Sequence, residues 1–239
     1  MLRLRTLGGL TLLVDGVSVT GALTQRRQLA LLALLAVARE QGMSRDKILS
    51  YLWPERDTET ARHILNQQLY SQRQSIGEEL FVGRKTLRLN PTMFECDLWS
   101  VEEALRAGRL EAAVESYRGP FLDGFHLREA GEFEEWVDTQ RRRLRREHLE
   151  ALEQLSRAAE SAGNLDDVLR WRRRAMETDP LDGTAALALA RTLVRRNDRP
   201  AAIRELRDYA TRVRTVLEVD PHPEVQRLLS ELGRASGHP

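Results

Sequence analysis

The side chains best suited to chemistry in this sequence lie between Asp57 and Gly77, in the stretch DTETARHILNQQLYSQRQSIG. When residues are placed at the steps of about 100° that define an α-helix, polar groups able to donate and accept hydrogen bonds collect on one half of the cylinder. They are Arg62, His63, Asn66, Gln67, Tyr70, Arg73 and Gln74. Arginine, asparagine and glutamine match base edges in the major groove of DNA. The pattern therefore indicates a DNA-contacting face, although an ordinary exposed helix face fits it as well.

The same stretch lacks the acidic residues that an exposed helix face usually carries. From Ala61 to Ile76 there is no aspartate or glutamate. The opposite half of the helix is apolar, as expected of a face turned to a core. Two glutamines, Gln68 and Gln72, interrupt that apolar half. A buried amide without partners costs about 1–3 kcal/mol, so this helix is predicted to be seated less firmly than its apolar residues alone would allow.

A second candidate contact is the basic tip Gly83-Arg84-Lys85-Thr86, which lies between the short apolar runs Leu80–Val82 and Leu87–Leu89. Two short strands around such a tip form a hairpin, and we expect Arg84 and Lys85 to contact DNA phosphates, which fix register without reading sequence. The segment is not a nucleotide-binding loop. Five residues separate Gly77 from Gly83, and an arginine stands where that motif requires lysine.

The elements around these residues predict a winged helix in residues 1–95. Asp15-Gly16 sits between apolar runs and is a strong hairpin signal near the amino terminus. Three helices should follow: one from a cap at Thr24 to about Gln41, one from a cap at Ser44 to Trp53, and the Asp57–Gly77 stretch. A hairpin, three helices and a second, basic hairpin follow the order of a winged helix, whose third helix enters the major groove.

Residues 96–239 are predicted to be helical throughout. A long helix from about Ala130 to Ala162 includes the arginine-rich run Arg141–Arg146. Such a run could bind nucleic acid, but we favour a solvated helix face among acidic neighbours. Similar segments begin at Gly163 and Asp198, 35 residues apart, close to the period of about 34 in tetratricopeptide repeats. Stacked helix pairs of that kind build surfaces for partners. The predicted fold is therefore mainly α with small β, a winged helix-turn-helix followed by a tetratricopeptide-like domain.

Composition points away from an enzyme or a membrane protein. Residues 1–95 hold 13 Lys and Arg against 9 Asp and Glu, whereas residues 96–239 are mildly acidic, which favours a polyanion-binding module joined to an interaction module. The five histidines are scattered and Cys96 is the single cysteine, so no metal site, cofactor or disulfide is expected. The longest apolar run is too short to cross a bilayer and no signal peptide is evident, so we expect a cytoplasmic protein.

Taken together, these segments resemble the SARP/BTAD family of bacterial transcriptional regulators, an OmpR-type winged helix followed by a bacterial transcriptional activator domain. The residues that carry the resemblance in the first half are Leu7-Gly8, Arg26–Leu32, Ser44–Asp46, Leu52–Pro54, Ala61–Gly77, Leu87–Leu89 and Asp97. In the second half they are Gly119–Leu122, Trp136, Gly163–Leu165, Asp179–Leu181 and Leu217–Glu224.

The resemblance implies that the protein binds double-stranded promoter DNA, typically as a dimer on repeated sites, and recruits RNA polymerase. Two positions depart from the family pattern: Gln72 stands where leucine is usual, and Gly183 where an acidic residue is common. The competing hypothesis is a helical-repeat adaptor whose degenerate winged helix contacts protein. A continuous positive surface over Arg62, Arg73, Arg84 and Lys85 would support DNA binding, and carboxylates closing it off would support the adaptor.

Overall fold

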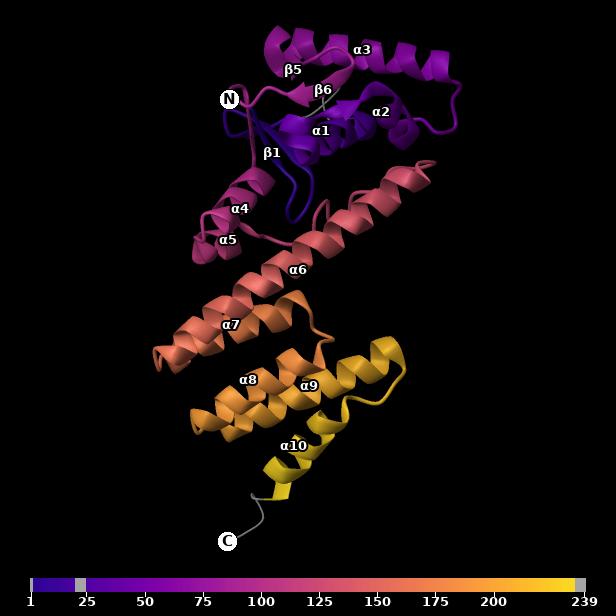
Figure 1. The fold of residues 1–239 in the computed structure, drawn as a ribbon. Helices are drawn as coiled ribbons and strands as arrows, with labels where there is room; N and C mark the ends of the chain where they lie inside the picture. The colour runs from indigo at the N-terminus through magenta and orange to yellow at the C-terminus, as the bar shows by residue number, and fades with distance from the viewer. Residues whose placement is uncertain (1, 20–24, 235–239) are drawn as a thin grey trace. The chain divides into compact units, whose positions relative to one another are not determined.

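The computed structural model describes residues 2–19 and 25–234, and the chain divides into two compact units, residues 1–146 and 147–239 (Figure 1). The first unit opens with a sheet of strand order β3-β2-β1-β7. Its strands are β1 (Leu2–Arg5), β2 (Thr11–Val14), β3 (Val17–Ser18) and β7 (Phe94–Cys96). The predicted hairpin is confirmed, because Asp15 and Gly16 both have positive φ, 48° and 84°, as a tight two-residue turn requires.

Strand β7 is an element that the sequence did not predict. Three residues long, it pairs in parallel with β1, so that Leu4 lies opposite Cys96. Both side chains are buried. The amino-terminal hairpin is thus tied to a segment some ninety residues later in the chain, as the register Leu2 to Phe94 shows.

Three helices follow the hairpin, as predicted. They are α1 (Arg26–Ala38), α2 (Arg45–Leu52) and α3 (Thr58–Ile76), with a short 3-10 turn, η2 (Arg39–Gln41), after α1. The Ser44 hydroxyl accepts the amide of Lys47, and the Asp57 carboxylate accepts that of Thr60, so both expected caps are present. Thr24, the expected cap of α1, lies outside the described residues. Helix α1 is buried around most of its surface, as its apolar run predicts.

The second hairpin is also present and makes the wing. Strands β5 (Phe81–Val82) and β6 (Thr86–Leu89) pair antiparallel, and β4 (Met43–Ser44) pairs with the other edge of β6. A 3-10 turn, η3 (Glu78–Leu80), joins α3 to β5. At Gly83, φ is 95° and an added Cβ would lie 2.1 Å from the Thr86 carbonyl oxygen, so the tip requires glycine. The predicted order of a hairpin, three helices and a second, basic hairpin is confirmed.

The first compact unit continues past residue 95. Helix α4 (Asp97–Arg106) and the first half of α6 (Gly131–Ser161) share its core, which includes Val101, Phe121 and Leu144, and α5 (Leu110–Ser116) packs on α4. The Asp97 carboxylate accepts the Thr6 amide at 2.9 Å and the Leu7 amide at 3.0 Å. A boundary between sequence modules at residues 95 and 96 stays a prediction, while the packing boundary falls at residues 146 and 147.

The arginine run of α6 is only partly a solvated face. Arg142, Arg145 and Arg146 are exposed, as predicted. Arg141 instead donates to the carbonyl oxygens of Phe121 and Leu122, both at 2.8 Å, and Arg143 pairs with Glu102 at 3.1 Å. For Arg141 and Arg143 the prediction is wrong, because a helix face that looks polar in sequence here meets backbone and acidic groups of neighbouring segments.

The second unit contains the rest of α6 and four further described helices. They are α7 (Leu165–Thr178), α8 (Gly183–Arg195), α9 (Arg199–Leu217) and α10 (Pro223–Arg234). Asn164 caps α7 and Asp198 caps α9, so equivalent caps recur after about 34 residues, as in tetratricopeptide repeats. Successive helices pack on one another around a core that includes Leu187, Leu206 and Val225. None of the described helices is long and apolar enough to cross a membrane.

The unusual glycine at position 183 has a steric explanation. A Cβ there would lie 2.7 Å from the Tyr209 hydroxyl and 3.2 Å from Cβ of His222. Tyr209 is buried against the helix start that Gly183 opens. A larger side chain, acidic or not, would displace this tyrosine, so the glycine permits close packing of α9 against α8.

The stability of the second unit is predicted to depend on pH because of the buried His148. The ring is 5% exposed, and burial, with a smaller contribution from Arg174, lowers its pKa from 6.5 to about 4. The unfolded chain therefore binds a proton between these values that the folded chain does not. We expect the free energy of unfolding to fall as the pH drops from 6.5 towards 4, by up to about 3 kcal/mol.

Chemical denaturation of the protein and of a His148→Leu variant at pH 7, 5.5 and 4.5 measures this effect. The difference between the two proteins isolates the histidine, since their carboxylates titrate alike. A difference that stays constant across the three pH values would contradict the prediction.

Candidate nucleic-acid interface

Helix α3 has the two faces that its sequence predicts. Ala61, Leu65 and Leu69 are buried and seat the helix in the first unit. The predicted contact residues lie mainly on the opposite, solvent-exposed side. Those that are exposed on α3 are Arg62, His63, Asn66, Gln67, Tyr70 and Gln74. Arg73 is half-buried, so only part of its guanidinium is available to a ligand.

Two internal pairs restrict what this face can offer. The Gln67 amide nitrogen and the His63 ring nitrogen lie 2.9 Å apart, so these side chains order each other. Arg62 forms an ion pair with Asp46 of α2 at 3.1 Å. Both members of that pair are exposed, and exposed ion pairs contribute only about 0–1 kcal/mol. A DNA phosphate could therefore displace Asp46 at small cost.

The wing and α3 are joined by one side chain, Arg45, the first residue of α2. Its Nε donates to the carbonyl oxygen of Arg84 at 2.7 Å, and its Nη1 donates to Oδ1 of Asn66 at 2.8 Å. Its backbone amide donates to the carbonyl oxygen of Lys85 at 3.3 Å. Arg45 thus fixes the wing tip relative to the middle of the helix, and it leaves the Asn66 amide group as a donor.

The charge at this junction is positive and is not balanced locally. Burial lowers the pKa of Arg45, and the positive charge of Arg73 lowers it further. Within the described parts of the chain, neither of these guanidinium groups has a carboxylate within ion-pair distance. The same holds for Arg84 and Lys85, which are exposed at the wing tip. Two repelling guanidinium groups beside two free cations form a surface that an anion would stabilise.

The predicted positive surface is therefore only partly continuous. Asp46 neutralises Arg62 at one end. At the wing end, Arg73, Arg84 and Lys85 have no carboxylate partner among the described residues. Of the nine residues predicted from sequence, those on the wing and those near Asn66 are brought together through Arg45. Sequence reasoning missed Arg45 as a site residue. A basic residue directly after a helix cap was the available signal, but its bridging role depends on tertiary contacts.

Gln68 and Gln72 lie on the inner side of α3, as predicted, and no polar neighbour satisfies Gln72 among the described residues. Gln72 is fully buried, and neither its Nε2 nor its Oε1 has a hydrogen-bond partner among the described residues. The half-buried Gln68 has a buried Oε1 in the same state, and so does Gln28 of α1. Burying unpaired amide atoms costs free energy. The apolar contacts of the leucines in α3 must therefore exceed this cost to keep the helix in place.

The described chain thus combines a hairpin, three helices and a second, basic hairpin with a helical-repeat domain. The chain belongs to the bacterial transcriptional activator domain family, whose model matches residues 100–232. The family is defined by a domain of bacterial transcriptional activators. No curated protein matches the sequence.

A solved structure with the same fold is that of Mycobacterium tuberculosis EmbR in complex with a low-affinity phosphopeptide. The TM-score is 0.63 with 22% sequence identity, and the match covers 98% of this chain. At this identity the likeness concerns the fold alone. This chain spans 65% of the length of that EmbR chain.

Proposed function

We propose that this protein is a transcriptional activator that binds double-stranded promoter DNA through α3 and the wing. On DNA, α3 lies in the major groove, where Asn66, Gln67, Tyr70 and their neighbours face base edges. Arg84 and Lys85 contact the phosphate backbone. The observation that carries the proposal is the unbalanced positive charge of Arg45 and Arg73 beside the acid-free face of α3.

The helical domain supplies protein contacts in this proposal. Family membership supports RNA polymerase as a partner, and a second copy of the chain on a repeated site as another. Stacked helix pairs offer extended surfaces suited to both. Such a protein works in the cytoplasm, where bacterial promoter DNA is located.

The wing provides the test. An Arg84→Ala/Lys85→Ala double variant is expected to weaken binding about equally on all duplexes, because phosphate contacts do not read sequence. The slope of log affinity against log salt concentration should fall by up to about two. Fluorescence anisotropy with a random-sequence duplex over a range of salt concentrations measures both quantities.

An Arg106→Ala/Arg109→Ala variant, which removes two exposed cations of the α4–α5 turn, is the matched control and should leave the slope unchanged. An unchanged slope in the wing variant would show that Arg84 and Lys85 do not contact DNA phosphates. The adaptor hypothesis, which the Arg62–Asp46 pair favours, predicts that the unmodified protein binds no duplex even at low salt.

A further inference from the structure

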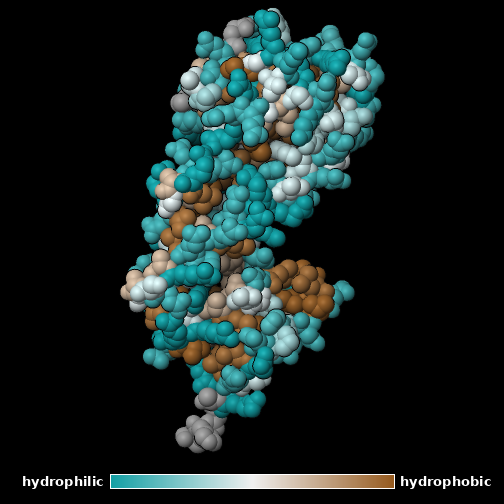
Figure 2. All heavy atoms as spheres, in the orientation of Figure 1, coloured by the Kyte–Doolittle hydropathy of each residue, from teal (hydrophilic) through white to brown (hydrophobic). Residues whose placement is uncertain are grey.

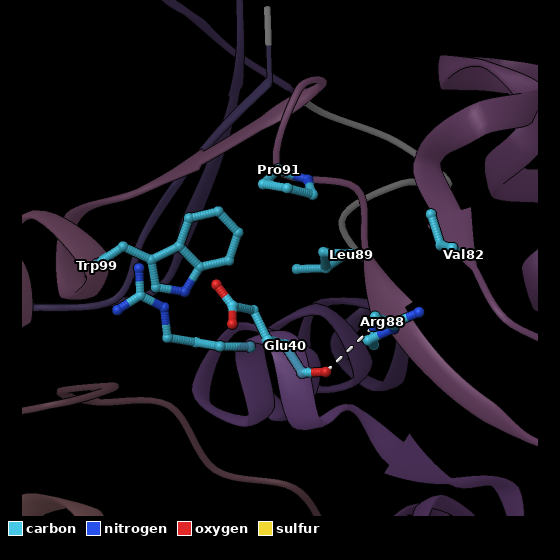
Figure 3. A pocket seen from close by; sticks show the side chains of 7 residues that line it. Glu40, Val82, Arg88, Leu89, Pro91 and Trp99 are labelled. Carbon is cyan, nitrogen blue, oxygen red and sulfur yellow. Dashed lines mark hydrogen bonds between the residues drawn. The ribbon is translucent and has the colours of Figure 1, made fainter.

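A small cavity lies beside the wing and has no role in the proposed DNA contacts (Figure 3). Its volume is about 250 Å³. Five segments of the first unit form its walls: the 3-10 turn after α1, the two wing strands β5 and β6, the turn after β6, and α4. The lining residues are Arg39, Glu40, Val82, Arg88, Leu89, Pro91 and Trp99.

Most polar groups in the walls are already engaged with the protein. The indole Nε1 of Trp99 donates to the carbonyl oxygen of Ala36 at 2.7 Å. Arg39 pairs with Glu102 at 3.2 Å, and its guanidinium lies 5.5 Å from the centre of the Trp99 ring. Arg88 donates to the backbone carbonyl oxygen of Glu40 at 3.3 Å. The surface left for a ligand is therefore the apolar part of the wall.

That apolar part is formed by the side chains of Trp99, Leu89, Pro91 and Val82. In Figure 3, Trp99, Pro91 and Leu89 lie around the hollow, and Val82 is drawn beyond the strand that carries Leu89. An aromatic ring together with aliphatic groups suits a flat apolar ligand, since most ligand pockets combine apolar walls with a few polar groups. The volume is slightly below the range of about 300–1,000 Å³ for drug-sized ligands. The cavity accordingly fits a one- or two-ring molecule.

One polar group remains available, the carboxylate of Glu40. Figure 3 shows it directed into the space between Trp99 and Leu89. Within residues 2–19 and 25–234 this carboxylate has no hydrogen bond or ion pair. An ionised carboxylate only accepts hydrogen bonds, so a ligand that uses it must present a donor.

The backbone conformation of Arg39, in the wall of the cavity, is a second and independent observation that points to a ligand site. Arg39 has φ 46° and ψ −128°, a conformation that residues other than glycine rarely adopt. Strained residues of this kind cost about 1–3 kcal/mol and cluster at ligand clamps and switch regions. The guanidinium of Arg39 lies against the Trp99 ring and pairs with Glu102 on one side of the cavity.

We propose that this cavity binds a small aromatic or alicyclic molecule of one or two rings that donates one hydrogen bond to Glu40. The rings pack on Trp99, Leu89 and Val82, and the donor faces the carboxylate. Because Val82 and Arg88 belong to the two strands that flank the wing tip, an occupant would restrict the tip with Arg84 and Lys85. This consequence for DNA rests on the proposed function, whereas binding itself does not.

Two isosteric probes test the chemistry. Indole has an N–H donor, and indene has a CH2 group in its place. We expect indole to bind about tenfold more tightly than indene, the difference that one hydrogen bond to a charged group makes. Glu40→Ala removes an exposed side chain and should reduce this ratio to about one. Ligand-observed NMR titration of the full chain gives the four dissociation constants.

A substitution that fills the cavity with a larger side chain tests whether the probes bind there. Val82→Trp should weaken both probes by about tenfold or more, and Val17→Trp, which adds the same ring at an exposed position of β3, should not. Equal binding of indole and indene by the unmodified protein, no binding at millimolar concentration, or unchanged binding in Val82→Trp would each overturn the proposal. Indole binding by a protein that binds no duplex would overturn the DNA proposal alone.

Discussion

Replacing Gln72 by leucine is expected to raise the free energy of unfolding of the first unit by about 1–3 kcal/mol. The side chain is fully buried, and both of its amide atoms lack partners among the described residues. Leucine removes the desolvation cost of these atoms and adds apolar contact with the core that seats α3. Most single substitutions destabilise a protein, so a gain of this size is distinctive.

Urea denaturation of the two proteins, followed by circular dichroism, measures the change. Gln67→Leu is the matched control, because Gln67 occupies an exposed position of the same helix and its replacement should alter stability by less than about 0.5 kcal/mol. Gln72→Met, with a more flexible side chain, tests whether leucine fits by shape. Loss of stability in both Gln72 variants would mean that the amide is satisfied in solution.

The sequence was sufficient to predict those parts of the fold that depend on local chemistry. Ser44 and Asp57 cap their helices, and Asp15-Gly16 turns the first hairpin, because each side chain or backbone preference acts on neighbours in the chain. The polar face of α3 followed from helical periodicity alone. The buried state of Gln72 followed from the same periodicity, which placed it among leucines.

The features that could not be predicted depend on partners distant in sequence. Strand β7 exists because β1 offers a free edge some ninety residues earlier. Arg141 donates hydrogen bonds to the carbonyl oxygens of Phe121 and Leu122. No local sequence pattern distinguishes it from the exposed Arg142 beside it. Asp46 reaches Arg62 from another helix. In each case a charged or extended segment acquires its role only when the tertiary fold supplies the partner.

Arg45 is the clearest case of such a residue, and its replacement by methionine is expected to reduce DNA affinity by about tenfold to a hundredfold. The change removes the two hydrogen bonds that connect Asn66 to the wing tip, and the expected loss corresponds to about 1.4–2.7 kcal/mol of binding free energy. Lys47→Met is the matched control, because Lys47 is an exposed cation on the same helix and bridges neither element.

Arg45→Lys separates the two contributions that Arg45 can make. Lysine keeps the positive charge, yet one ammonium group does not reproduce the planar fork that reaches the Arg84 carbonyl and the Asn66 amide together. If Arg45 acts by positioning, the lysine variant loses affinity while its salt slope stays unchanged, and amide hydrogen exchange accelerates in residues 83–86. If Arg45 acts instead as a phosphate contact, the lysine variant retains affinity and the methionine variant lowers the slope by about one. Unchanged affinity and exchange in both variants would exclude Arg45 from the interface and leave the wing held by the β4–β6–β5 sheet alone.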